Sequence, residues 1–96
     1  MITSENIIFH ELIGLEVEVI NSFNESLIGI NGKVVDETKK TLLIETSNDS
    51  EKLLPKDVSI FKFTLPNGSH VEVNGKILLN RPEDRIKKRH KKFNWW

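Results

Sequence analysis

The chain has 96 residues and a mass of 11.1 kDa, which suffices for one small domain because separate hydrophobic cores need roughly 100 to 150 residues each. A two-domain enzyme is therefore excluded. The absence of cysteine excludes disulfides, thiolate metal sites and thiol nucleophiles. No apolar run exceeds three residues, which is far short of a signal-peptide core or a membrane span, so we expect a cytoplasmic protein.

The formal net charge of zero conceals a separation of charge along the chain. Residues 1–80 carry seven Lys or Arg and twelve Asp or Glu, a net charge of −5, whereas residues 81–96 carry seven and two, a net charge of +5. An acidic body with a basic end favours a polyanionic partner that is approached through that end. A basic C-terminus that is simply solvated explains the same charges equally well.

The first predicted element is a short helix over about residues 4–13. Capping residues precede it, Ile8 and Leu12 stand at helical spacing, and Gly14 ends it. The apolar period then changes to two, which indicates a half-buried strand over residues 15–19.

Further strands are predicted from apolar runs that are separated by turn residues. They cover residues 28–36, 41–46, 51–54, 58–65, 70–74 and, as a last short apolar strand, 76–79. Gly29 and Gly32 interrupt the first of these runs, and glycine inside a strand indicates a bulge, a bend or a close backbone approach. A strongly curved strand fits a small barrel.

A basic helix is predicted over about residues 82–92, with Pro82 in its first turn. Arg85, Lys88, Arg89 and Lys92 fall at i, i+3, i+4 and i+7, so they form one cationic face that suits phosphates. The chain thus predicts a single domain over residues 1–96. We expect a mainly β fold: a small antiparallel barrel of about six strands over residues 15–79, with a short helix at each end.

No group of residues predicts catalysis or metal binding. His10 and Glu11 resemble the start of a metalloprotease helix, but no second histidine follows at the required spacing. His70 and His90 have no nucleophile nearby and are better explained as structural or surface residues. The Gly29 to Gly32 spacing matches a loop that clamps a nucleic-acid backbone, but its β-branched neighbours favour a bend.

Three more lysines are candidate phosphate contacts. Lys39 and Lys40 occupy a predicted turn, and Lys33 lies on the bent strand before it. Whether they join the basic helix in one surface is left open by the sequence. The aromatic end, Phe93, Trp95 and Trp96, favours packing or contact with a partner over stacking on bases.

Four stretches resemble one protein family. They read HELIGL from residue 10, GKVVDET from residue 32, TLLIET from residue 41 and RPEDRIKK from residue 81. In this order and spacing the chain resembles archaeal ribonuclease P protein component 1 from about residue 4 to residue 89. The RPEDR run is the most specific element of the match.

The resemblance implies an Sm-like, SH3-like barrel and a non-catalytic subunit of the ribonucleoprotein that removes the 5′ leader from precursor tRNA. Its partners would be ribonuclease P RNA, precursor tRNA, the zinc-ribbon protein subunit and other ribonuclease P proteins, with a monomer when the chain is free. The protein would bind no cofactor, because Mg²⁺ and the catalytic groups would belong to the RNA.

The resemblance also assigns site residues. It implies RNA contacts at Lys39, Lys40, Arg81, Arg85, Lys88 and Arg89. The other basic residues that we expect to contact RNA are Lys33, Lys87 and Lys92. Contacts with a protein partner are expected at Ile8, Leu12, Ile30 and Val34. Two other functions stay open: a barrel adaptor that docks a peptide on its aromatic end and sheet edges, and an independent Sm-like RNA chaperone ring.

Overall fold

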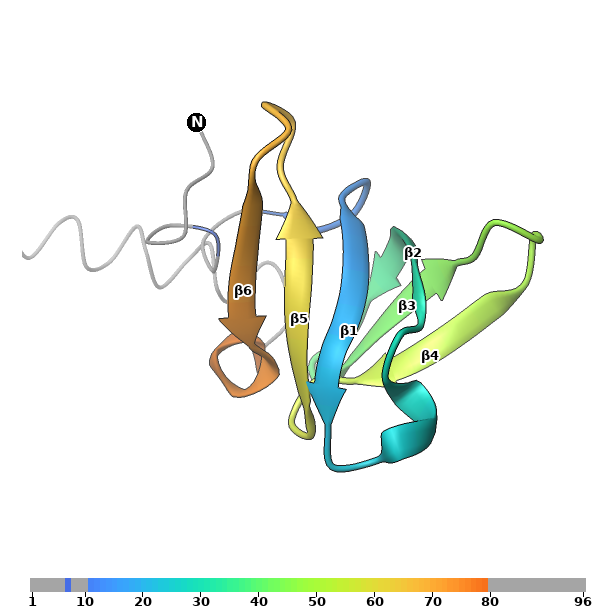
Figure 1. The fold of residues 1–96 in the computed structure, drawn as a ribbon, viewed down its shortest axis with the longest axis vertical. Coiled ribbons are helices and arrows are strands. Elements are labelled where there is room, and N and C mark those ends of the chain that lie inside the picture. The colour runs from blue at the N-terminus through green and yellow to red at the C-terminus, as the bar shows by residue number, and fades with distance from the viewer. Residues whose placement is uncertain (1–6, 8–10, 80–96) are drawn as a thin grey trace, which may run out of the picture.

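The computed structural model describes residue 7 and residues 11–79, and this part of the chain is mainly β (Figure 1). Six antiparallel strands form one sheet in the order β4-β3-β2-β1-β5-β6. The strands are β1 (Glu16–Ser22), β2 (Asn31–Glu37), β3 (Thr41–Glu45), β4 (Glu51–Pro55), β5 (Ser59–Thr64) and β6 (His70–Asn74). The prediction of a mainly β fold with about six antiparallel strands is confirmed.

The core lies against one face of this sheet because the strands alternate buried and exposed side chains. In β5, for example, Phe61 and Phe63 are fully buried while Ile60 and Lys62 between them are partly exposed. The other buried apolar residues are Ile7, Leu12, Leu15, Val17, Val19, Val34, Leu42, Ile44, Leu54, Leu65, Val71, Val73 and Leu78.

Two bulges bend the sheet. The register shifts between Val19 and Asn21 where β1 pairs with β5, and between Val34 and Asp36 where β2 pairs with β3. In Figure 1, β6, β5 and β1 run side by side, while β3 and β4 run diagonally to the right of them. The close approach predicted for Gly32 is confirmed, because a Cβ there would lie 2.3 Å from the carbonyl oxygen of Glu45.

The sheet has two edges in the described part of the chain. There β4 pairs with β3 alone, and β6 pairs with β5 alone. No pairing among the described strands joins β4 to β6, so closure into a barrel is not shown.

The prediction of a strand over residues 76–79 is wrong, because this segment forms the 3₁₀ helix η3 (Gly75–Leu78). The side chain of Asn74 accepts a hydrogen bond from the Lys76 amide at 3.0 Å and caps this turn. Gly75 fits against the backbone of Lys56, where a Cβ would lie 1.8 Å from the carbonyl oxygen. A second 3₁₀ helix, η2 (Glu25–Leu27), follows β1.

The predicted terminal helices fall mostly on residues that the structure does not describe. Residues 82–92 lie outside the described part, as do residues 4–6 and 8–10 of the predicted first helix. Residues 11–13 are described and do not form a helix; they lead into a turn in which Gly14 has φ +96°. Within the described residues, no helix is long and apolar enough to cross a membrane.

Candidate nucleic-acid interface

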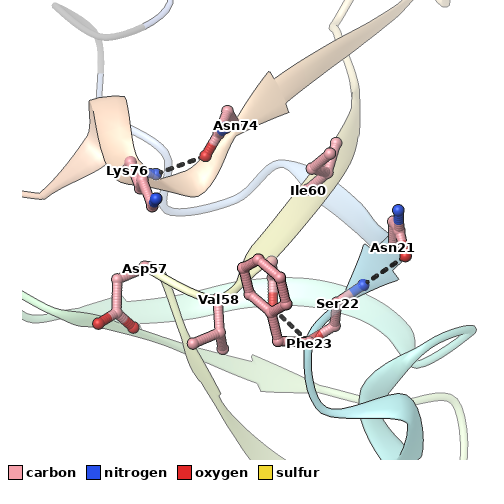
Figure 2. Close-up of a pocket in the computed structure, with 9 residues that line it drawn as sticks. Asn21, Ser22, Phe23, Asp57, Val58, Ile60, Asn74 and Lys76 are labelled. Carbon is pink, nitrogen blue, oxygen red and sulfur yellow. Dashed lines mark hydrogen bonds between the residues drawn. The ribbon is translucent and has the colours of Figure 1, made fainter.

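A pocket of about 190 Å³ opens where the ends of β1, β5 and β6 meet (Figure 2). The end of β1, the β4–β5 turn, β5 and the start of η3 all contribute to it. We name it the Phe23 pocket, and its lining residues are Asn21, Ser22, Phe23, Asp57, Val58, Ser59, Ile60, Asn74 and Lys76. The Phe23 amide donates to the Val58 carbonyl at 2.9 Å, which holds the end of β1 against the β4–β5 turn.

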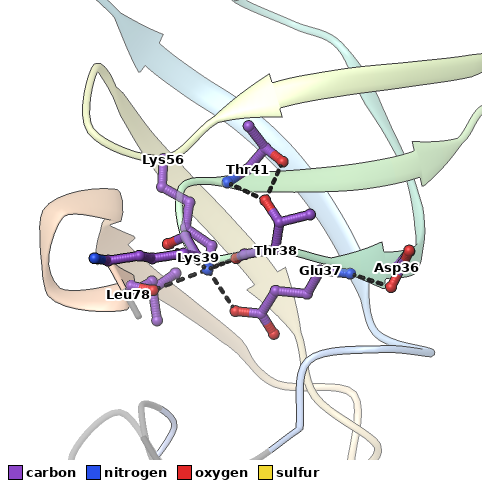
Figure 3. A network of polar contacts seen from close by, with 7 residues as sticks. All are labelled: Asp36, Glu37, Thr38, Lys39, Thr41, Lys56 and Leu78. Atoms are coloured by element: carbon purple, nitrogen blue, oxygen red, sulfur yellow. Dashed lines mark hydrogen bonds and ion pairs between the residues drawn. The ribbon is translucent and has the colours of Figure 1, made fainter. Parts of the chain in front are cut away.

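On the other side of that turn, a fully buried lysine joins three segments of the chain (Figure 3). The Lys56 ammonium donates to Glu37 Oε2 at 2.6 Å, to the Thr38 carbonyl at 2.7 Å and to the Leu78 carbonyl at 2.9 Å. It also lies 3.4 Å from the Lys39 carbonyl. A buried lysine needs such partners, because an uncompensated charge in the core is very costly. We call this set of contacts the Lys56 network.

The Lys56 network fixes the turn between β2 and β3, which carries two of the predicted RNA contacts. The amide of Lys56 also donates to the Lys40 carbonyl at 2.8 Å, so the turn is bound through its backbone. Thr38 closes it from within, since its hydroxyl oxygen accepts the Thr41 amide at 3.1 Å. The side chains of Lys39 and Lys40 are exposed. We name this exposed pair the lysine turn.

Lys33 lies elsewhere, in an acidic row across the outer face of the sheet. It is exposed and stands opposite Glu16 of β1 on one side and Glu45 of β3 on the other. Residues directly opposite each other on adjacent strands share a face and interact. Lys33 therefore has a glutamate on the neighbouring strand at each side, and the structure does not bring this lysine together with the lysine turn.

The predicted partner contacts fall into different environments. Leu12 and Val34 are fully buried core residues, whereas Ile30 is partly buried and packs against the core from outside. Ile8 lies outside the described residues, as do Arg81, Arg85, Lys87, Lys88, Arg89 and Lys92. Among described residues, the exposed large apolar side chains are Ile13, Phe23, Ile28, Leu53 and Ile77.

The sequence does not indicate that Lys56 is buried and joins three segments of the chain. Lys56 follows a proline between two strands, and such a position is typical of an exposed turn lysine. Glu37 gave no signal either, because it stands beside Asp36 in what reads as a polar turn. Within the described residues, no group of three or more His, Cys, Asp or Glu is arranged to hold a metal ion.

Comparisons with known proteins agree on one family. Residues 5–88 match the family described as Ribonuclease P/MRP, subunit p29. Ribonuclease P protein component 1 of Methanosphaera stadtmanae is 52% identical over 93 residues, which cover 97% of this chain and 99% of that protein. The protein of the same name from Methanocaldococcus jannaschii is 52% identical over 91 residues, 95% of each chain.

A solved structure is also similar. It is described as Mth11, a homologue of human RNase P protein Rpp29, and is 47% identical to this chain. The superposition has a TM-score of 0.59 and covers 80% of this chain and 99% of the other. An identity of 47% shows that the two proteins are similar in sequence as well as in fold.

Proposed function

Because the chain belongs to the archaeal ribonuclease P protein component 1 family, we propose that it is a non-catalytic, RNA-binding subunit of ribonuclease P. In this role it assists the catalytic RNA in removing the 5′ leader from precursor tRNA. Its own contribution is to neutralise and position phosphates, while the catalytic groups and Mg²⁺ belong to the RNA. The closed Sm-like barrel is part of the proposal, and the bulges in β1 and β2 support it through the curvature that they impose.

The structural observation that supports a phosphate-binding surface is the Lys56 network. It holds the lysine turn beside Leu78, with the carbonyls of Thr38 and Leu78 both within 3 Å of one ammonium nitrogen. Arg81, the first residue of the basic segment, follows Leu78 by three positions in the sequence. The last described 3₁₀ helix thus ends beside the lysine turn, and the basic sequence follows it in the chain, so we propose that the two form one phosphate-binding surface.

A protein partner is the second part of the proposal, because membership of the complex implies other subunits. The described surface offers apolar side chains for such a contact around the η2–β2 loop, where Ile28 is exposed and Ile30 is half-buried. We propose that the zinc-ribbon subunit of ribonuclease P docks here. Leu12 and Val34 are fully buried core residues, so they cannot contact a partner directly, and Ile30 packs against the core that they belong to.

The proposed function is tested by precursor-tRNA cleavage with the cognate catalytic RNA. The other protein subunits are present, Mg²⁺ is limiting, and this chain is added or omitted. We expect faster cleavage when the chain is added, since protein cations substitute for part of the Mg²⁺ that screens RNA phosphates. An unchanged rate would contradict the proposal and favour the adaptor function, and the mass of the free protein would reveal a chaperone ring.

A charge reversal locates the RNA surface. We expect the double variant Lys39→Glu/Lys40→Glu to need roughly tenfold more protein, or greater, for half-maximal stimulation of cleavage, because it places two negative charges against RNA phosphates. Lys52→Glu is the matched control, since Lys52 is also exposed but lies on the edge strand β4. Arg85→Glu/Arg89→Glu tests the basic segment in the same assay. Equal effects of the Lys52 and lysine-turn variants would show a general charge effect instead of a defined surface.

A further inference from the structure

The Phe23 pocket is not used by the function proposed above. Its volume of about 190 Å³ is below the range of roughly 300–1,000 Å³ that is usual for sites that enclose a whole small molecule. It has room for one planar ring. An occupant of this size would be part of a larger molecule that is held elsewhere on the protein.

The lining of the pocket combines an aromatic face with hydrogen-bonding groups. Phe23 exposes 87% of its surface although it is the largest apolar side chain of the lining. Figure 2 shows its ring in the middle of the lining residues, with Val58 on one side and Ser22 on the other. The exposed ring offers an accessible aromatic face on which a planar group can stack.

The polar groups of the pocket suit the edge of a nucleobase. Asn21 and Asn74 each use the side-chain oxygen to accept a backbone amide, from Ser22 at 2.9 Å and Lys76 at 3.0 Å. Their NH₂ groups can donate to the carbonyl oxygens and ring nitrogens of a base. Asp57 supplies an exposed carboxylate that can accept from an exocyclic amino group. Stacking together with such edge contacts is the usual way in which proteins recognise unpaired RNA bases.

The pocket lies next to the proposed phosphate-binding surface, because two segments contribute to both. In the β4–β5 turn, Lys56 forms the network under the lysine turn, and the following residue, Asp57, lines the pocket. In η3, Lys76 lines the pocket while the Leu78 carbonyl accepts from Lys56. An RNA strand whose phosphates contact the lysine turn can therefore present a neighbouring base to the Phe23 pocket.

We propose that the Phe23 pocket receives one unpaired nucleobase of the RNA, stacked on the Phe23 ring and held at its edge by Asn21, Asn74 and Asp57. The inference rests on the proposed RNA-binding function and adds base recognition to it. The competing occupant is an apolar side chain of another protein subunit, which the same ring and Val58 could accept.

The test uses the full chain bound to the cognate ribonuclease P RNA. The RNA is probed with reagents that modify unpaired bases and, in parallel, with hydroxyl radicals that report on the backbone. We expect Phe23→Ala to remove the protection of an unpaired base, to retain most backbone protection and to weaken RNA binding roughly 5- to 100-fold. Phe23→Trp should retain the base protection, whereas Phe23→Leu, which keeps apolar bulk without an aromatic face, should lose it. Leu53→Ala, at another exposed apolar residue, is the matched control.

The outcomes separate this inference from the proposed function. Base protection that is unchanged in Phe23→Ala, with backbone protection lost in Lys39→Glu/Lys40→Glu, would overturn the base pocket and support RNA binding. No protection of any kind by the wild-type chain would overturn both. If Phe23→Ala loses a protein subunit from the assembled enzyme while Phe23→Leu retains it and base protection is unchanged, the occupant is a protein side chain and the inference is wrong.

Discussion

Lys56 joins the lysine turn to η3 through a buried ammonium group, and burying this charge costs desolvation free energy. Lys56 and Glu37 both have fully buried side chains, and their charges left water when the chain folded. Replacing such a pair with apolar residues is often neutral or stabilising, whereas removing one partner of the pair is strongly destabilising. The Lys56 network is therefore better explained by what it positions, the lysine turn and the end of η3, than by the stability that it adds.

Removal of the Lys56 ammonium is expected to be costly. Lys56→Met breaks the 2.6 Å ion pair with Glu37 and the hydrogen bonds to the Thr38 and Leu78 carbonyls, so we expect a loss of about 3–5 kcal/mol in the free energy of unfolding. Urea unfolding followed by circular dichroism measures it. The control is Lys62→Met, which breaks the exposed 3.4 Å pair with Glu18 and should cost less than about 1 kcal/mol. Similar losses in both variants would show that burial of the first pair has no special weight.

The strands could be predicted from sequence and the last element could not, for a physical reason. A strand with one buried face repeats its apolar residues with a period of two, as Phe61 and Phe63 do in β5, and that signal is local. Residues 77–79 form the apolar run ILL, which is equally compatible with a strand. Their 3₁₀ conformation depends on the Asn74 cap and on the contact between Gly75 and the Lys56 backbone, and the latter is set by tertiary packing.

The edge strand β4 leads to a prediction about association. Leu53 is 59% exposed there, and its neighbour Lys52 places a charge on an edge that pairs on one side among the described strands. Charged residues on edge strands oppose pairing with another chain. We expect Lys52→Val to produce concentration-dependent self-association, measured by sedimentation velocity. Lys62→Val is the control, because β5 is already paired on both sides. A Lys52→Val variant that stays monomeric at every concentration would show that the lysine is not needed to protect this edge.

In the molecule as a whole, charge is sorted in space as well as along the chain. On the outer face of the sheet, Lys33 stands opposite Glu16 and Glu45, and Lys62 stands opposite Glu18 and Glu72. The lysine turn lies apart from this face, beside η3. From the sequence alone, Lys33, Lys39 and Lys40 are equivalent candidates for RNA contact. Their separation depends on strand register, which places Lys33 between two carboxylates, and on the Lys56 network, which pairs residues 18 to 22 positions apart.

The salt dependence of RNA binding should reveal this sorting. Each phosphate contact contributes about 0.7 to 0.9 to the slope of log K against log salt concentration, because binding releases a condensed counterion. If the lysine turn contacts two phosphates, Lys39→Gln/Lys40→Gln lowers the magnitude of the slope by about 1.4 to 1.8. Lys33→Gln should leave the slope unchanged, since Glu16 and Glu45 on the neighbouring strands make this part of the surface unfavourable for a phosphate. Filter binding of ribonuclease P RNA between about 50 and 200 mM salt measures both variants. A Lys33→Gln slope reduced as much as that of the double variant would place RNA on the outer face of the sheet and contradict a surface confined to the lysine turn and the basic segment.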